Sequence, residues 1–170
     1  MHATPQWGEE GCSMLRGLMQ DAPLLISGIL EYAARAHGER EIVSKAVDEP
    51  VWRYDWHRCD QRARQAAQAL GVLGIAMGDR VSSNTHRHLE LFYAAPGMGA
   101  VLHTANPRLS DEQIAFTIAH AGSRILFFEP NLAELVARLR PLLPGIERYV
   151  LLADRGATAP DVADALNYEA

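Results

Sequence analysis

Short apolar segments alternate with amphipathic ones between residues 80 and 152, and this alternation limits the possible folds more than any other feature of the chain. The apolar segments have the length and composition of strands, whereas the segments between them repeat apolar residues at helical spacing. Strands separated by helices form βαβ crossovers, which build a mainly parallel sheet with helices on both faces. The predicted class is therefore α/β, with apolar strands at residues 100–104, 124–128 and 149–152, a short polar candidate strand at residues 80–83, and helices beginning near residues 86, 111 and 131.

A short helix and a hairpin are predicted before this sheet. Ser27 is a suitable N-cap for a helix over residues 28–36, where apolar residues recur at helical spacing. Two β-prone runs, 41–46 and 51–54, flank the turn-forming sequence Asp48-Glu49-Pro50 and therefore predict a hairpin.

Capping residues predict where the longer helices begin and end. Asp55 is the expected N-cap of an amphipathic helix that ends near Gly74, with Arg58, Arg62 and Arg64 away from its apolar face. The sequence Ser110-Asp111-Glu112-Gln113 is a capping box that opens a helix through His120. Pro96 is expected to bend or end the helix that contains it.

The chain is predicted to divide into three stretches. Residues 1–14 have little periodicity and are expected to be a loose extension, and residues 15–153 form the α/β unit. Residues 154–170 are expected to begin a linker or a further helix, because Val162, Leu166 and Tyr168 have roughly helical spacing.

No phosphate-binding loop or metal-binding motif is present in the sequence. Neither G-x-G-x-x-G nor G-x-x-x-x-G-K-[ST] occurs, and Gly97-Met98-Gly99 is better explained by close backbone packing. In His86-Arg87-His88 the two imidazoles diverge by about 200 degrees on a helix, so they cannot share an ion, and a solvated first turn is predicted.

The remaining polar candidates have simpler explanations than catalysis. His103 lies in an apolar strand and is interpreted as a hydrogen-bonded core histidine, and Asn106 as part of a turn. Asp111 and Glu112 lie in the first turn of a helix, where the helix dipole favours carboxylates. The residues therefore identify no catalytic, cofactor-binding or metal-binding side chain.

Charge and composition restrict the partners of the chain. A net charge of −5 and scattered arginines argue against a nucleic-acid partner. Lys45 is the single lysine among 16 basic residues, which leaves few candidates for a lysine that binds phosphate. Cys12 and Cys59 form no C-x-x-C motif and are expected to be buried or unreactive.

The sequence predicts a cytoplasmic protein without a transmembrane segment. The longest nearly apolar run, residues 91–104, is interrupted by Pro96, Gly97 and Gly99 and is shorter than the roughly 20 residues that a membrane helix needs. The start of the chain has no basic region followed by an apolar stretch, so no secretory signal is expected.

Several ordered motifs resemble the acyl-CoA synthetases of the adenylate-forming, AMP-binding superfamily. The sequence GDRV at 78–81 resembles these synthetases in general, and the block PGMGAVLHTANPRLS at 96–110 is most similar to their medium- and long-chain fatty-acid–CoA ligases. The segment WRYDWHRCDQRARQAAQALGVLGIAMGDRV, at 52–81, is similar to the first core motif of this family and the helix after it. The resemblance covers residues 15–153 and implies the first N-terminal subdomain of such an enzyme.

The resemblance implies a fatty acid as substrate and ATP, magnesium and coenzyme A as cofactors of the full-length enzyme. Family members activate the carboxylate as an acyl-adenylate and transfer the acyl group to coenzyme A. Their Ser/Thr/Gly-rich phosphate loop, adenine and ribose motifs and catalytic lysine have no counterpart in this sequence. The chain is therefore predicted to be an N-terminal fragment that binds none of these cofactors alone and is inactive in isolation.

Two departures from the family pattern are apparent. About three residues are missing between Val81 and Asn84, which would pull the next helix inward by about 10 Å or force a change of register. The chain also stops at Ala170, shortly before the family's phosphate loop.

Two other functions remain open from the sequence. A non-enzymatic α/β module could pair with another chain, for example as a homodimer, because an incomplete parallel sheet has an open edge. A complete small nucleotide-binding domain is the weakest alternative, because the phosphate loop is absent.

Overall fold

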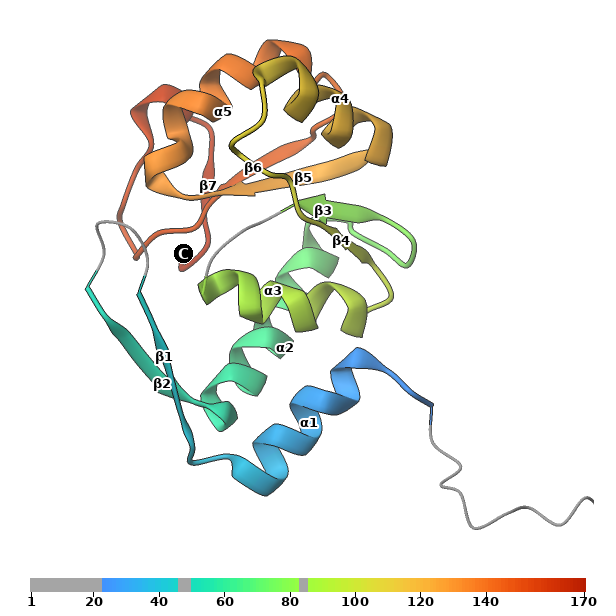
Figure 1. The fold of residues 1–170 in the computed structure, drawn as a ribbon, viewed down its shortest axis with the longest axis vertical. Helices are drawn as coiled ribbons and strands as arrows, with labels where there is room; N and C mark the ends of the chain where they lie inside the picture. Colours follow the sequence, from blue (N-terminus) through green and yellow to red (C-terminus); the bar gives the residue numbers. More distant parts are fainter. Residues whose placement is uncertain (1–22, 46–49, 83–85) are drawn as a thin grey trace, which may run out of the picture.

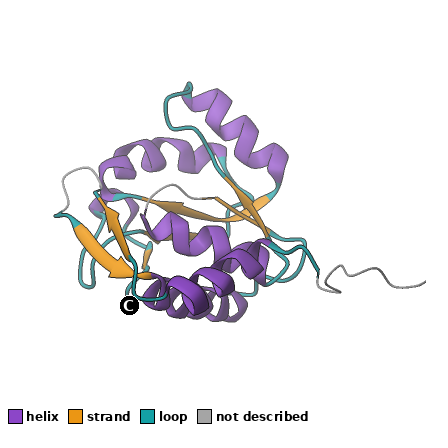
Figure 2. Cartoon of the chain, turned by 60° about the horizontal axis from the view of Figure 1, so that its bottom comes forward, coloured by secondary structure: helices purple, strands orange, loops and turns teal. Residues whose placement is uncertain are grey.

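The computed structural model describes residues 23–45, 50–82 and 86–170, and helices lie on both sides of its larger sheet (Figures 1 and 2). None of the described helices is long and apolar enough to cross a membrane. The elements in chain order are α1 (Ile26–His37), β1 (Glu41–Ser44), β2 (Trp52–Asp55), α2 (Trp56–Val72), β3 (Arg80–Ser82), α3 (His86–Gly97), β4 (Val101–His103), α4 (Asp111–Ala121), β5 (Ser123–Phe128), the 3-10 turn η1 (Pro130–Leu132), α5 (Ala133–Leu139), η2 (Arg140–Leu142), β6 (Arg148–Leu151), η3 (Pro160–Val162) and β7 (Leu166–Asn167).

The larger sheet has five strands in the order β4-β3-β5-β6-β7, and every neighbouring pair is parallel. The predicted parallel sheet is therefore confirmed. The predicted hairpin is also present, because β1 and β2 pair antiparallel, with Ile42 opposite Tyr54. The turn expected at Asp48 and Glu49 lies outside the described residues.

Side chains of the inner strands alternate between two apolar cores. In β5, Ile125 and Phe127 join the core that contains residues of α2 and α3, whereas Leu126 and Phe128 join the core of α4 and α5. Successive side chains of a strand point to opposite faces, so a strand covered on both faces is apolar throughout. The predicted helices on both faces are confirmed. A third, smaller core joins α1, β2 and α2 through Leu30, Tyr54, Cys59 and Ala63.

Two of the predicted helix caps are present and one is wrong. The Asp55 carboxylate accepts a hydrogen bond from the backbone N–H of Arg58 at 2.7 Å, and Ser110 and Gln113 form the reciprocal capping box. Ser27 does not cap α1, which begins at Ile26 with Leu25 at its N-cap. The carbonyl of Leu25 already accepts the N–H of Gly28 at 3.1 Å, so Ser27 lies inside the first turn.

The helix predicted around Val162, Leu166 and Tyr168 is wrong. This segment forms the turn η3 and then β7, which pairs with β6 so that Leu166 lies opposite Val150. The N–H of Tyr168 also donates to the carbonyl of Leu151 at 3.0 Å. Unpaired backbone groups at the edge of β6 are satisfied by this pairing, which involves residues too distant in sequence for a periodicity to reveal.

The short strand β3 lies between β4 and β5 and has only three residues. Its pairing with β5 shifts register between Arg80 and Val81. Asn84 and Thr85, expected to cap the next helix, lie outside the described residues.

Candidate functional site

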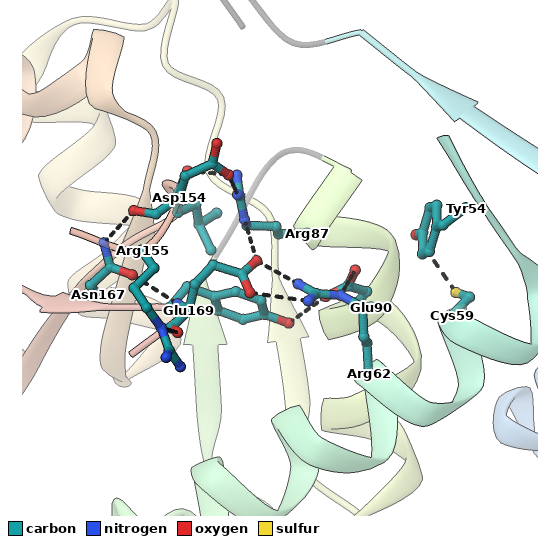
Figure 3. A network of polar contacts seen from close by, with 11 residues as sticks. Tyr54, Cys59, Arg62, Arg87, Glu90, Asp154, Arg155, Asn167 and Glu169 are labelled. Carbon is teal, nitrogen blue, oxygen red and sulfur yellow. Dashed lines mark hydrogen bonds and ion pairs between the residues drawn. The ribbon is translucent and has the colours of Figure 1, made fainter. Parts of the chain in front are cut away.

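Five charged side chains from separate parts of the chain meet beside the carboxyl end of β6 (Figure 3). Arg62 comes from α2, and Arg87 and Glu90 come from α3. Asp154 follows β6, and Glu169 follows β7. We call these five residues the ionic cluster. Because ligands of open α/β sheets bind beyond the carboxyl ends of the strands, this position makes the cluster the first candidate for a functional site.

Glu169 links the two arginines of the cluster. Its carboxylate accepts two hydrogen bonds from Arg62, at 2.6 and 3.0 Å, in a bidentate arrangement. The same carboxylate accepts a third hydrogen bond from Arg87 Nε at 3.0 Å. The tail of the chain is thereby held to both α2 and α3.

Arg87 and Glu90 are the most deeply buried members, with 1% and 0% of their surface exposed. Arg87 donates to Asp154 Oδ1 at 2.6 Å and to the carbonyl of Leu152 at 3.2 Å. Glu90 accepts from Arg62 Nε at 2.7 Å and from the hydroxyl of Tyr168 at 2.8 Å. Buried charges are tolerated where they are paired and hydrogen-bonded in this way.

The cluster changes the proton affinity of its members. Burial by itself would raise the pKa of Glu169, but hydrogen bonds from Arg62 and Arg87 lower that pKa below its usual range. Burial opposes the charge of Arg62 as well, yet the carboxylates of Glu169 and Glu90 raise the pKa of Arg62. Burial, followed by the charge of Glu90, raises the pKa of Tyr168. The carboxylate of Glu169 and the guanidinium of Arg62 are therefore held in their charged forms.

The cluster was not predicted from the sequence, and the prediction for Arg87 was wrong. Arg87 was expected in a solvated first turn. Arg62 was expected away from the apolar face of its helix, where it in fact pairs with Glu90 and Glu169. Arg87 and Glu90 in fact share a helical stripe with the buried residues Leu91 and Ala94, and that spacing was a usable signal. The partners Asp154 and Glu169 are more than 60 residues away in the chain, so local spacing could not identify them.

A cavity of about 740 Å³ adjoins the cluster, between α2 and the tail. Its floor is formed by Phe127 of β5 and Val150 of β6, both largely buried. Most of the other residues that line the cavity are apolar, and several charged residues line it as well. Prominent among these lining residues are Arg58, Ala69, Leu73, Arg155, Leu166 and Tyr168.

The residues of the ionic cluster do not suit a nucleoside triphosphate. Both guanidinium groups already bind carboxylates, and two cations face three carboxylates, which leaves an excess of negative charge. A polyphosphate would therefore meet electrostatic repulsion and would have to break buried ion pairs. The geometry instead supports a structural role, in which the cluster fixes the tail against α2 and α3.

Asn106 forms the predicted turn, His103 has a polar neighbour but is not fully buried, and the solvated first turn predicted for His86-Arg87-His88 is wrong at the buried Arg87. His103 is half-buried, its Nδ1 lies 3.5 Å from the hydroxyl of Ser123, and burial lowers its pKa. Asn106 Oδ1 accepts the backbone N–H of Arg108 at 3.0 Å, which is a side-chain turn. His88 packs near Phe92, with ring centroids 6.4 Å apart. Within 23–45, 50–82 and 86–170, no group of three or more His, Cys, Asp or Glu residues could hold a metal ion.

The glycine and cysteine interpretations also agree with the structure. Gly99 has φ of 84°, and a Cβ atom there would lie 3.0 Å from Cγ of Met77, so this glycine permits close packing. Cys59 is fully buried, and burial raises the pKa of its thiol to about 11. Lys45 follows β1 and is exposed. Cys12 lies outside the described residues.

The family model for AMP-binding enzymes matches residues 30–167. The chain belongs to this family. It is 43% identical over 146 residues to the 3-methylmercaptopropionyl-CoA ligase of Ruegeria lacuscaerulensis and 42% identical over 140 residues to the long-chain-fatty-acid–CoA ligase of Thermus thermophilus. These alignments cover 84% and 81% of the chain but only 27% and 26% of the relatives. This member of the AMP-binding family thus spans about a quarter of the length of the curated relatives that it matches.

Solved structures of AMP-binding enzymes have the same fold. The N-terminal domain of FACL13 from Mycobacterium tuberculosis matches 81% of the chain with a TM-score of 0.68 and 25% identity, and the match covers 37% of that domain. The anthranilate CoA ligase AuaEII matches 88% of the chain with a TM-score of 0.70 at 20% identity, which shows the fold alone. The resemblance recognised from the motifs is confirmed.

Proposed function

We propose that residues 15–153, with the tail fixed by the ionic cluster, are the first subdomain of an ATP-dependent medium- or long-chain fatty-acid–CoA ligase. The match to AMP-binding enzymes over residues 30–167 is the observation that carries this proposal. Two relatives that share 42% and 38% identity are named as long-chain and medium-chain fatty-acid–CoA ligases. We expect residues 1–14 to be an extension without a part in this function.

The proposed contribution of the chain is structural. Buried pairs formed by Arg62 and Arg87 hold Glu169 and Asp154 against α2 and α3, so the segment after Glu169 would leave the sheet from a defined position. ATP, magnesium and coenzyme A would be bound by other parts of the full-length ligase. We expect that enzyme to work in the cytoplasm, where ATP and coenzyme A are available.

The chain alone is expected to be inactive. It has neither the Ser/Thr/Gly-rich loop nor a lysine outside the region of the hairpin, and its buried arginines are occupied by carboxylates. Purified chain with ATP, magnesium, coenzyme A and laurate should release no AMP above background. Robust turnover by the purified chain would refute the inactivity.

A chimera tests the ligase assignment itself. In this chimera, residues 30–170 replace the matching segment of the Thermus thermophilus ligase, with which the chain shares 42% identity. This segment contains the family match at residues 30–167 and keeps Tyr168 and Glu169 of the tail. The folded chimera should form lauroyl-CoA, because the segment supplies the scaffold and the remainder supplies the cofactor-binding parts. A folded chimera without activity, beside an active parent enzyme, would argue against the assignment.

A non-enzymatic module that pairs with another chain is the second candidate. Exposed apolar side chains on α1, among them Ile26, Ile29 and Tyr32, favour this alternative. Size-exclusion chromatography with light scattering distinguishes the two functions, because such a module should form a dimer or a larger complex. A clean monomer at all concentrations counts against the module.

A further inference from the structure

The cavity beside the ionic cluster is a groove with a helical wall. Along α2, the lining residues Arg58, Arg62, Gln65, Ala69 and Val72 recur at three and four positions, so they form one continuous face of the helix. Residues three and four positions apart lie on the same side of a helix. The opposite wall is the tail after β6, and the sheet is the floor.

Much of the groove surface is apolar and exposed. Val72 has 88% of its surface exposed and Leu166 has 42%. The exposed Ala69 and the half-buried Leu73 also line the groove. An aliphatic surface of this kind beside an apolar sheet floor is stabilised when another element covers it.

We propose that this groove seats an amphipathic helix from the part of the ligase N-terminal domain that the chain does not match. The inference rests on the proposed function. The chain corresponds to 37% of the N-terminal domain of FACL13, so most of that domain lies outside the matched segment. At the groove, α2, the sheet and the tail together line a largely apolar cavity with a volume of about 740 Å³, which such a segment can fill.

The groove specifies the chemistry of its occupant. The wall from Arg58 to Leu73 is roughly 22 Å long at about 1.5 Å per residue, which matches a helix of about 15 residues. Apolar side chains of that helix should repeat at three and four positions and contact Val72, Leu73 and Leu166. Arg58 and Arg155 are exposed on the rim, so we expect carboxylates on the flank of the helix that faces them.

Cysteine accessibility tests the inference in the chimera described above. Ala69→Cys places a thiol in the groove. The chimera does not contain Cys12, and the isolated chain carries Cys12→Ser. Cys59 is fully buried, and burial raises the pKa of its thiol, so we expect it to react slowly. A thiol reagent should label Ala69→Cys at least tenfold more slowly in the chimera than in the isolated chain. Phe116→Cys on α4, a position with 67% exposure on the other side of the sheet, is the comparison.

Each outcome decides the inference. Protection of Ala69→Cys that exceeds protection of Phe116→Cys supports a seated helix, and a threefold or greater acceleration of Ala69→Cys labelling by Arg58→Glu supports its acidic flank. Equal labelling of Ala69→Cys in both proteins, or equal protection at both positions, overturns the inference. Protection that develops in the isolated chain as its concentration rises also overturns it, because the occupant would then be a second copy.

The failure of this inference can be distinguished from the failure of the proposed function. Lauroyl-CoA formation is measured on the same chimera samples. A protected but inactive chimera keeps the seated helix and refutes the ligase assignment. An active chimera in which Ala69→Cys stays unprotected supports the ligase assignment and refutes the seated helix.

Discussion

Replacement of Arg87 by methionine should destabilise the chain more than any comparable change at a surface arginine. Arg87 is 1% exposed and donates to Glu169, Asp154 and the carbonyl of Leu152. Methionine fills similar space but leaves these acceptors without that donor. The substitution therefore removes the charge and the hydrogen bonds together.

The expected loss follows from what each acceptor can regain. Removal of one partner from a buried ion pair costs about 3–5 kcal/mol. Asp154 is 71% exposed and can be solvated by water, and Glu169 keeps its bidentate contact with Arg62. We therefore expect the lower end, a decrease of about 3 kcal/mol in the free energy of unfolding. This is a large share of the roughly 5–15 kcal/mol that stabilises a typical domain.

Urea unfolding followed by circular dichroism measures this change. With a slope of about 2 kcal/mol per molar urea, typical of small proteins, the midpoint should fall by about 1.5 M. The slope itself should stay the same if the variant unfolds in one step.

Arg53→Met is the matched control. Arg53 pairs with Glu41 at 2.6 Å, but the two side chains are 59% and 52% exposed. Exposed pairs contribute about 0–1 kcal/mol, so the midpoint should fall by less than about 0.5 M. If Arg87→Met and Arg53→Met shift the midpoint equally, the ionic cluster does not stabilise the tail and the reasoning is wrong.

Two further predictions concern pH and helix capping. The lowered pKa of Glu169 means that its stabilisation is present above the unfolded value of about 4.3 and is lost as pH falls through the folded value. The urea midpoint of the unmodified chain should therefore exceed that of Glu169→Gln at pH 6, and the two midpoints should approach each other towards pH 3. If the difference between the midpoints grows as the pH falls, the pKa of Glu169 is not lowered in the folded chain. Ser110→Ala removes the cap that accepts the N–H of Gln113 and should cost about 1 kcal/mol, or roughly 2–4 °C in melting temperature. Ser110→Asp should keep the cap, and an equal loss in both variants would argue against capping.

The parts of the structure that depend on neighbouring residues could be predicted from the sequence. Asp55 and Ser110 were identified as caps because a cap and its N–H partner lie within three residues of each other. Strands β5 and β6 were identified because burial on both faces demands nearly continuous apolar runs, as in Arg124 to Phe128. The order of motifs also identified the family.

The ionic cluster and the last strand could not be predicted in this way. Arg62 and Glu169 are 107 positions apart, and β7 exists because the edge of β6 offers unpaired backbone groups to a distant segment. Whether an arginine is solvated or buried depends on the carboxylates that the fold brings to it. The sequence by itself therefore determined the family, the α/β class and most element boundaries, because these depend on local pattern. Only the tertiary structure decided that the tail closes over α2 and α3, because charges can be buried only where distant partners meet them.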